Sequence, residues 1–183
     1  MGRPSSIDRN LVLNVVESLV REQGVAGVTI GAVARAAGIS KGGVQSAFGT
    51  KEQLLQAVFD RWTADYEAGI AHIAGSAPSV REAYAAHVEI TRGTDSGQVD
   101  RAAGMMATAL SSPKIQAQVA QWYMAQLERA DFTSESGRQA RVAFIAAEGA
   151  YLLRAFGVLK VSDGEWESLF EDIERLLPNQ DRG

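Results

Sequence analysis

Hydrophobic residues recur along the whole chain at three- and four-residue steps, the spacing that places side chains on one face of a helix. The first such run contains Leu11, Val12, Val15, Val16 and Leu19, and polar residues fall mostly on the opposite face. Stretches with the two-residue alternation of a half-buried strand are absent, and glycines and prolines punctuate the sequence at helix lengths. The pattern predicts an all-α protein of about nine helices.

Helix starts are indicated by three pairs with the spacing of a capping box, in which a Ser and an acidic residue three positions later satisfy the free N–H groups of a first turn. These pairs are Ser5 with Asp8, Ser79 with Glu82, and Ser162 with Glu165. Gly24 and Gly38 are expected to end the first two helices. We expect helices at about 8–24, 30–38, 41–48, 51–73, 79–92, 99–110, 112–129, 137–159 and 163–177.

Two of the expected helices, 30–38 and 41–48, are short and meet at a turn that contains Gly38. Ala34 is small enough for the second of these helices to cross closely, and Ile39 fills the space between them. Ser40 is placed to cap the second helix. This arrangement predicts a helix-turn-helix, a motif whose second helix reads the DNA major groove.

The outward face of the helix at 41–48 carries Lys41, Gly42, Gln45 and Ser46. Glutamine pairs bidentately with adenine, and lysine reaches guanine or a phosphate. Gly42 and Gly43 each cost ~1 kcal/mol relative to alanine in a helix, and close approach of the backbone to DNA is a functional reason for them. The alternative is a helical hairpin whose polar face is simply solvated.

Residues 5–60 resemble the DNA-binding domain of the TetR/AcrR family of transcriptional regulators. The residues that carry the resemblance are Gly24, Thr29, Ile30, Val33, Ala34, Ala37, Gly38, Ile39, Ser40, Lys41, Gly42, Phe48, Lys51, Leu54 and Leu55. The resemblance implies a three-helix DNA-binding domain at residues 1–50 and a helical-bundle ligand-binding and dimerisation domain at 51–183. It also implies a homodimer that binds double-stranded DNA at an inverted-repeat operator.

The resemblance further implies DNA contacts from the start of the second helix, from the recognition helix and from the start of the fourth. The residues at these positions are Thr29, Ser40, Lys41, Gly42, Gly43, Gln45, Ser46 and Lys51. Three positions depart from the family pattern, which usually has Tyr at Gln45, often Tyr or His at Ala47, and often Thr at Gly43. Operator sequences of other members therefore do not transfer to this chain, and Arg3 is a further candidate contact on an N-terminal arm.

Aromatic and methionine side chains, with one histidine, recur along the expected helices of the second domain. Apolar clefts between bundle helices, with a few polar groups, are common ligand sites. The candidates for such a site are Trp62, Tyr66, His87, Met105, Trp122, Tyr123, Phe144 and Tyr151. Each of them also fits an ordinary place in the core. The residue types favour a small hydrophobic or aromatic effector over a sugar or a nucleotide.

The last two expected helices carry candidates for self-association. Small residues let helices approach closely, and an apolar stripe needs a partner surface. The candidates are Ala143, Ala147, Ala150, Trp166, Phe170 and Ile173. Packing within one chain would satisfy the same pattern, and the family resemblance favours a dimer.

Composition excludes several classes of protein. The 183 residues are 46% hydrophobic and 22% charged, as in a globular rather than a disordered chain. No cysteine is present, which excludes disulfides and cysteine zinc sites, and two histidines make a multi-histidine metal site improbable, so we expect no metal and no cofactor. The net charge is −4, but residues 1–51 carry six basic and three acidic side chains, which favours a local anionic partner.

The sequence also lacks the motifs of common enzymes, namely a glycine-rich phosphate loop, HExxH and Gly-x-Ser-x-Gly, and we expect no catalytic activity. It has no apolar run long enough to span a membrane and no signal-peptide pattern at its start, so we expect a cytoplasmic protein. The predicted function is a transcriptional regulator, a repressor released from a palindromic operator by a small hydrophobic effector. The alternatives are a helical small-molecule binding protein without specific DNA binding, and a sequence-independent DNA binder, which the acidic composition disfavours.

Overall fold

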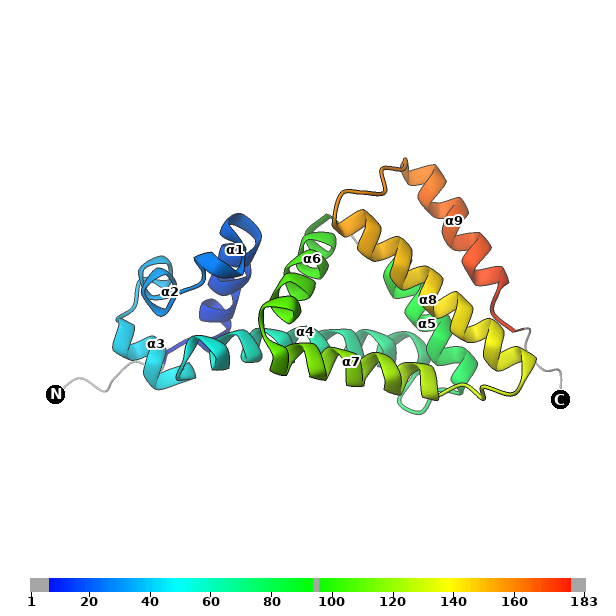
Figure 1. Cartoon of the computed structure of the whole chain (residues 1–183), viewed down its shortest axis with the longest axis horizontal. Helices are drawn as coiled ribbons and strands as arrows, with labels where there is room; N and C mark the ends of the chain where they lie inside the picture. Colours follow the sequence, from blue (N-terminus) through cyan, green and yellow to red (C-terminus); the bar gives the residue numbers. More distant parts are fainter. Residues whose placement is uncertain (1–6, 94–95, 179–183) are drawn as a thin grey trace. The chain divides into compact units, whose positions relative to one another are not determined.

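The computed structural model describes residues 7–93 and 96–178, and this part of the chain forms nine α-helices and no strand (Figure 1). The helices are α1 (Arg9–Gly27), α2 (Ile30–Ala37), α3 (Lys41–Phe48), α4 (Lys51–Ala74), α5 (Val80–Arg92), α6 (Ser96–Ser111), α7 (Pro113–Glu128), α8 (Glu135–Ala155) and α9 (Asp163–Arg175). The prediction of an all-α protein is confirmed. Within the described ranges, none of the helices is long and apolar enough to cross a membrane.

Capping explains where most of the helices begin. The capping boxes predicted at Ser79 and Glu82 and at Ser162 and Glu165 are both present, at the starts of α5 and α9. At α1 the prediction needs correction, because Asp8 is itself the N-cap and accepts hydrogen bonds from two backbone N–H groups. Ser5 and Arg3 lie outside the described residues.

Two helices end three or more residues away from the expected boundaries. Gly24 has a φ of +68°, which favours glycine, and it interrupts the helix as expected, but a further short turn follows this kink and extends α1 to Gly27. The extra turn is closed by the N–H of Val28, which donates to the carbonyl of Val25 at 3.2 Å. Helix α8 ends at Ala155, four residues earlier than expected, where Gly157 reverses the chain with a φ of +67°.

The chain divides into two compact units. The first comprises residues 1–63 and 104–116, and the second comprises residues 64–103 and 117–183. Helices α4, α6 and α7 each contribute residues to both units. The boundary at residue 50 between a DNA-binding and a ligand-binding domain concerns function, and it stays a prediction.

In the first unit, α1 to α4 surround a core of β-branched and leucine side chains. Val12, Val33, Val44 and Leu54, one from each helix, have no exposed surface. The opposite faces of α1, α3 and α4 point outward and carry mainly polar residues. Packing of the apolar faces holds the short helices α2 and α3, which have only two turns each.

A partly buried carboxylate joins α1 to α4 in the first unit. Glu17 accepts a hydrogen bond at 2.7 Å from the indole N–H of Trp62, and the guanidinium of Arg61 also donates to it. Arg61 donates in addition to Asn14 at 2.8 Å. Gly104 of α6 lies close to α1, since an added Cβ would be 3.0 Å from a methyl of Val20.

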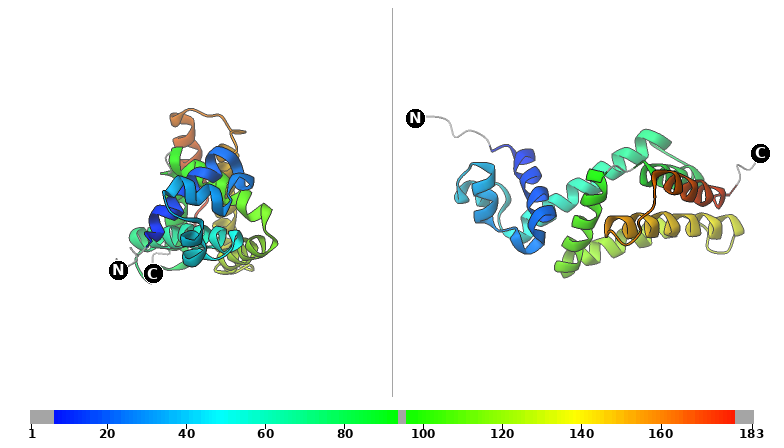
Figure 2. Two further views of the ribbon diagram at one scale, coloured as in Figure 1. Left: turned by 90° about the vertical axis from the view of Figure 1, so that its left-hand side faces the viewer. Right: turned by 90° about the horizontal axis from the view of Figure 1, so that it is seen from above.

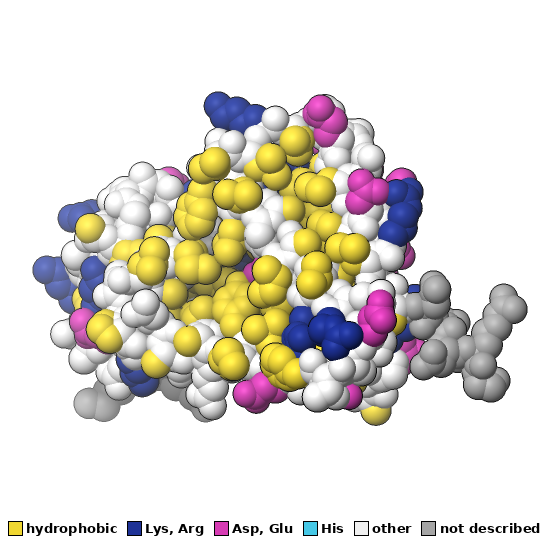
Figure 3. All heavy atoms as spheres, turned by 45° about the vertical axis from the view of Figure 1, so that its right-hand side comes forward, with side chains coloured by type: hydrophobic (Ala, Val, Ile, Leu, Met, Phe, Trp, Pro, Cys, Tyr) yellow, Lys and Arg dark blue, Asp and Glu magenta, His cyan; other side chains and the backbone are white. Residues whose placement is uncertain are grey.

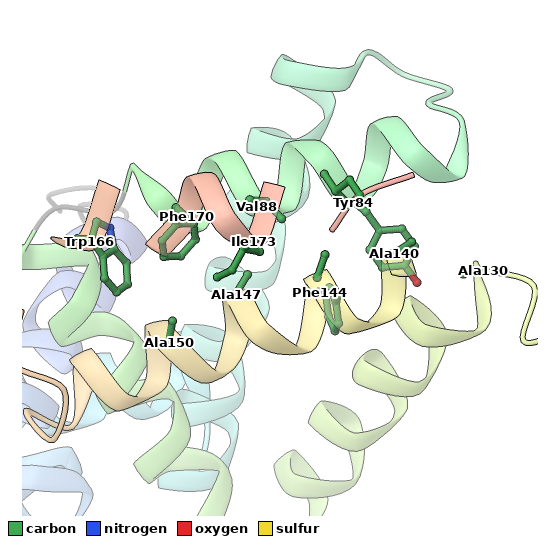
Figure 4. Close-up of a cluster of buried hydrophobic side chains, with 12 residues drawn as sticks. Tyr84, Val88, Ala130, Ala140, Phe144, Ala147, Ala150, Trp166, Phe170 and Ile173 are labelled. Carbon is green, nitrogen blue, oxygen red and sulfur yellow. The ribbon is translucent and has the colours of Figure 1, made fainter. Parts of the chain in front are cut away.

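The core of the second unit forms where α8 packs against α5 and α9 (Figures 1, 2 and 4). All six residues predicted to form a dimer interface are buried here within a single chain, namely Ala143, Ala147, Ala150, Trp166, Phe170 and Ile173. The intramolecular alternative left open by the sequence therefore accounts for both the small residues of α8 and the apolar stripe of α9. Their residues are at most 8% exposed in the single chain, and a role in a dimer stays a prediction.

A different face of α8 exposes large apolar side chains. Val142 is 56% exposed, Ile145 51%, Leu153 47% and Phe156 50%. Their spacing places Val142, Ile145 and Leu153 on one narrow stripe of the helix, and Phe156 follows as its C-cap residue. Figure 3 shows a face of the molecule on which hydrophobic side chains gather. Clustered exposed apolar side chains are typical of an interaction surface.

The tight start of α8 gives a stability prediction. An alanine Cβ at Gly137 would lie 2.0 Å from the backbone carbonyl oxygen of Asp131, so the backbone would have to move. Gly137→Ala should lower the free energy of unfolding by about 1–3 kcal/mol in urea titrations, a typical cost of overpacking. Gly164→Ala in α9, where nothing lies within 4 Å of the added Cβ, is the control and should cause no loss. Equal stability of the two variants would contradict the packing described here.

Candidate functional site

The turn between α2 and α3 is built from local hydrogen bonds. Thr29 caps α2 by accepting from the N–H of Ala32 at 3.0 Å, and Ser40 caps α3 by accepting from the N–H of Gly43 at 3.0 Å. Gly38 ends α2 with a φ of +68°, a left-handed conformation that costs glycine little. The N–H of Ile39 donates back to Ala34 at 3.0 Å. These bonds set the angle between the two helices, as a helix-turn-helix requires.

Helix α3 presents one apolar and one polar face. Val44 and Phe48 are buried against the rest of the first unit. Lys41, Gln45 and Ser46 are exposed, and so are Gly42 and Ser40 at the same end of the helix. The sequence-predicted recognition face is therefore assembled as a continuous exposed strip on the second helix of the motif.

Besides Ser40, which caps α3, three of the predicted DNA-contacting residues also have structural partners. A Cβ at Gly43 would lie 3.0 Å from a methyl of Ile7, so this position is partly enclosed by the start of the chain. The ammonium of Lys51 donates to the carbonyl of Val25 at 2.9 Å and so holds the end of α1. The Thr29 hydroxyl is engaged in the helix cap described above.

Arg9 is a positioning residue that the sequence analysis did not single out. Its guanidinium lies 4.1 Å above the ring of Phe48 and donates to the carbonyl of Ala47. Both contacts are at the last turn of α3, where a cation also stabilises the helix dipole. Arg9 thereby fixes the recognition helix against α1.

In the second unit, five of the predicted ligand-binding residues come together from four helices. Tyr66 of α4 meets Trp122 of α7 edge to face, with ring centroids 5.2 Å apart. His87 of α5 lies 4.4 Å from Phe144 of α8, and Trp122 lies 5.0 Å from its neighbour Tyr123. We call these five residues, with Glu148, the aromatic cluster.

A chain of polar contacts crosses this cluster. The hydroxyl of Tyr66 is 2.6 Å from Nδ1 of His87, and Nε2 of the same ring is 3.3 Å from Oε1 of Glu148. The hydroxyl of Tyr123 donates a hydrogen bond to Oε2 of Glu148. We assign the Nε2–H tautomer to His87 because Nδ1 then accepts from Tyr66. Nε2 is buried and makes no hydrogen bond of acceptable geometry.

Burial shifts the ionisation of this network strongly. Loss of water lowers the pKa of His87 from 6.5 to about 3, so the imidazole is neutral at pH 7. Burial raises the pKa of Glu148, and the hydrogen bond from Tyr123 acts in the opposite direction. The pKa values of Tyr66 and Tyr123 are raised, first by burial and then by the charge of Glu148.

The other three predicted ligand residues lie elsewhere or at the margin. Trp62 and Met105 belong to the first unit, where the Trp62 indole is held by Glu17. Tyr151 is partly buried and lies three positions after Glu148 on α8, which puts the two side chains on the same face of the helix. Trp62 and Met105 are therefore described with the first unit, and their ligand role stays a prediction.

Glu148 was missed by the sequence analysis, although a signal was present. It is the one acidic residue within the run of small and apolar residues from Val142 to Leu153, and it lies four positions after Phe144. A charged residue on the inward face of such a helix indicates a functional role or a buried partner. In the part of the chain that the structure describes, no group of three or more His, Asp or Glu side chains could hold a metal ion.

The fold and the exposed face of α3 define a helix-turn-helix DNA-binding regulator with a separate helical second unit. Residues 13–58 match the family model of bacterial regulatory proteins of the tetR family, and residues 81–178 match the tetracyclin repressor-like C-terminal domain. The chain belongs to the TetR family of transcriptional regulators, which confirms the resemblance found in the sequence.

Solved structures support the same fold. Multidrug binding protein EbrR, complexed with malachite green, has a TM-score of 0.68 at 20% identity, covering 93% of this chain and 98% of its own. NalD, the secondary repressor of the MexAB-OprM multidrug efflux pump in Pseudomonas aeruginosa, has a TM-score of 0.68 at 19% identity, covering 94% and 96%. A transcriptional regulator from Rhodococcus sp. Rha1 has a TM-score of 0.67 at 20% identity, covering 93% and 94%. No curated protein matches the chain in sequence.

The depressed pKa of His87 predicts an acid-sensitive fold. Below pH 6.5 the unfolded chain binds a proton at this histidine that the folded chain does not bind until about pH 3, so stability falls as the pH drops. Between pH 6.5 and 5 wild type should lose about 2 kcal/mol more free energy of unfolding than His87→Gln. Glu148 has the opposite effect on the free energy of unfolding, since its raised pKa lets the folded chain hold a proton as the pH falls. This effect is present in both wild type and His87→Gln.

Urea titrations at the two pH values measure this difference. His72→Gln, which replaces an exposed histidine of α4, is the control and should follow wild type. Parallel losses in wild type and His87→Gln would show that the buried imidazole does not govern the acid response.

Proposed function

We propose that this protein is a transcriptional repressor that binds an inverted-repeat operator as a homodimer and is released by a small hydrophobic molecule. The observation that carries the proposal is the exposed strip of α3, with Lys41, Gln45 and Ser46 side by side on the second helix of a helix-turn-helix. Such a protein acts in the cytoplasm and needs no cofactor and no catalytic step. The repressor role is supported by NalD, whose description names it a repressor.

On DNA, the strip of α3 is expected to lie in the major groove. Gln45 supplies an amide for an adenine, and Lys41 and Ser46 supply donors for a guanine or for phosphates. Thr29 and Lys51 are proposed to contact phosphates. The ammonium of Lys51 has three N–H bonds, so its bond to Val25 is compatible with a phosphate contact.

The dimer is proposed to form through the exposed stripe of α8. Val142, Ile145, Leu153 and Phe156 form an apolar surface that a two-fold copy would cover with the same residues. A two-fold dimer places its two recognition helices in successive major grooves about 34–36 Å apart, which requires an inverted-repeat operator.

The effector is proposed to bind at the aromatic cluster and to act through α4. This helix is continuous from Lys51 to Ala74, and it carries Tyr66 of the cluster. A ligand that displaces Tyr66 would tilt α4 and change the spacing of the two recognition helices. Linkage requires the ligand to favour the DNA-free arrangement, by about 1–3 kcal/mol for a typical coupling. EbrR supports such a role, since its description names a complex with malachite green.

The recognition face can be tested by base preference. Gln45→Ala should weaken binding to the best site by about 1–3 kcal/mol and relax the preference at one base pair in each half-site. Selection from randomised DNA, followed by gel-shift titration at fixed salt, measures both effects. Gln121→Ala, on an exposed position of α7, is the matched control and should select the same operator as wild type. An unchanged base preference in Gln45→Ala would show that this face does not read the operator.

The dimer surface can be tested by charge. Ile145→Glu places a carboxylate in the middle of the α8 stripe and should weaken dimerisation about 100-fold, because the charge would be buried without a partner. Since Ile145 is half exposed, the variant should keep its helical content and sediment as a monomer at micromolar concentration. Ser168→Glu, exposed on α9, is the control and should remain dimeric. A wild-type monomer, or a dimeric Ile145→Glu, would contradict the proposal.

A further inference from the structure

We propose that the aromatic cluster selects a lipophilic organic cation, a ligand with an aromatic body and a permanently charged ammonium group, and that Glu148 is its counter-charge. This inference rests on the proposed function only in taking the cluster as the effector site. It adds the charge class of the ligand, which the aromatic residue types alone do not give.

The first argument is the charge balance around Glu148. Its side chain is 13% exposed, and in the described part of the chain the structure pairs it with no lysine or arginine. The neighbouring imidazole of His87 is neutral at pH 7 and does not balance the carboxylate. A buried carboxylate without a cation is costly, and a ligand that carries the missing positive charge would remove that cost.

The second argument is the kind of surface that surrounds the carboxylate. Tyr123 donates to the carboxylate, and its ring contacts those of Trp122 and Phe144, while Tyr66 contacts Trp122. Aromatic faces attract cations. Quaternary ammonium groups are bound in proteins by such groups of aromatic rings because they cannot donate hydrogen bonds. Tyr66, Trp122 and Tyr123 are only partly buried, so a part of each side chain is open to solvent.

The third argument is the orientation of the polar atoms. Nε2 of His87 is buried, lacks a hydrogen-bond partner and lies 3.3 Å from Oε1 of Glu148. Among the residues that the structure describes, a hydroxyl engages one carboxylate oxygen, Oε2, and this hydroxyl is that of Tyr123. The nearby cation Arg129, which lowers the pKa of Tyr66 by its charge, is exposed and is not paired with the carboxylate. An anionic ligand would meet Glu148 directly and be repelled.

The test compares two probes of nearly the same shape, benzyltrimethylammonium and its uncharged carbon isostere neopentylbenzene. Calorimetric titration of the full-length protein at pH 7.5 should show the cation binding about tenfold or more tightly than the isostere. Glu148→Gln keeps the size of the side chain and an acceptor for Tyr123, and it should remove the preference. Glu148→Asp keeps the charge and should retain a preference for the cation.

Glu89→Gln, which neutralises an exposed glutamate of α5, is the matched control and should behave as wild type. Circular dichroism confirms that each variant is folded. Equal affinities of wild type for the two probes, or an undiminished cation preference in Glu148→Gln, would overturn the inference.

Gel shifts with the selected operator separate this inference from the proposed function. Cation binding that depends on Glu148 but leaves the operator complex intact would support the ligand class and refute release by an effector at this site. Specific operator binding without any charge preference among the probes would refute the ligand class and leave the regulator intact.

Discussion

The second unit depends on the close approach of α8 to α5 and α9. Ala143 and Ala147 have no exposed surface, and their small side chains let the helix axes come near enough for Phe144 and Phe170 to fill the core. Because Phe144 is turned inward, the residue four positions later, Glu148, is turned inward as well. The packing of alanines thus brings a carboxylate next to His87, where burial and not a neighbouring cation governs its ionisation.

The features that could be predicted from the sequence are those fixed by contacts between residues close together in the chain. The boxes at Ser79 and Ser162 and the left-handed turn at Gly38 are decided within a few residues, and the structure confirms them. The exposed and buried faces of α3 also follow from its own period. The end of α1 could not be predicted in the same way. Whether the chain resumes a helical turn after Gly24 depends on contacts of that turn with distant residues, such as the hydrogen bond from Lys51 to Val25.

Contacts between distant residues could not be read from the sequence. The period of α9 showed that Trp166 and Phe170 face one way, but it could not show whether α8 of the same chain or a second copy covers them. Residue type likewise suggested a ligand role for both Trp62 and Trp122. Only the fold shows that Glu17 holds one indole in the first unit while the other joins the aromatic cluster.

Binding and switching make different demands on the aromatic cluster. A residue raises affinity by contacting the ligand equally in every arrangement of the protein, but it contributes to release only if its contact differs between the DNA-bound and free arrangements. Glu148, His87 and Trp122 lie on helices other than α4, so under the proposed function they set which ligand binds. Tyr66 is the cluster residue carried by α4, the helix that begins with Lys51. The hydroxyl of Tyr66 forms a hydrogen bond with His87. Under the proposed function, a ligand that breaks this hydrogen bond would move Tyr66 and with it α4.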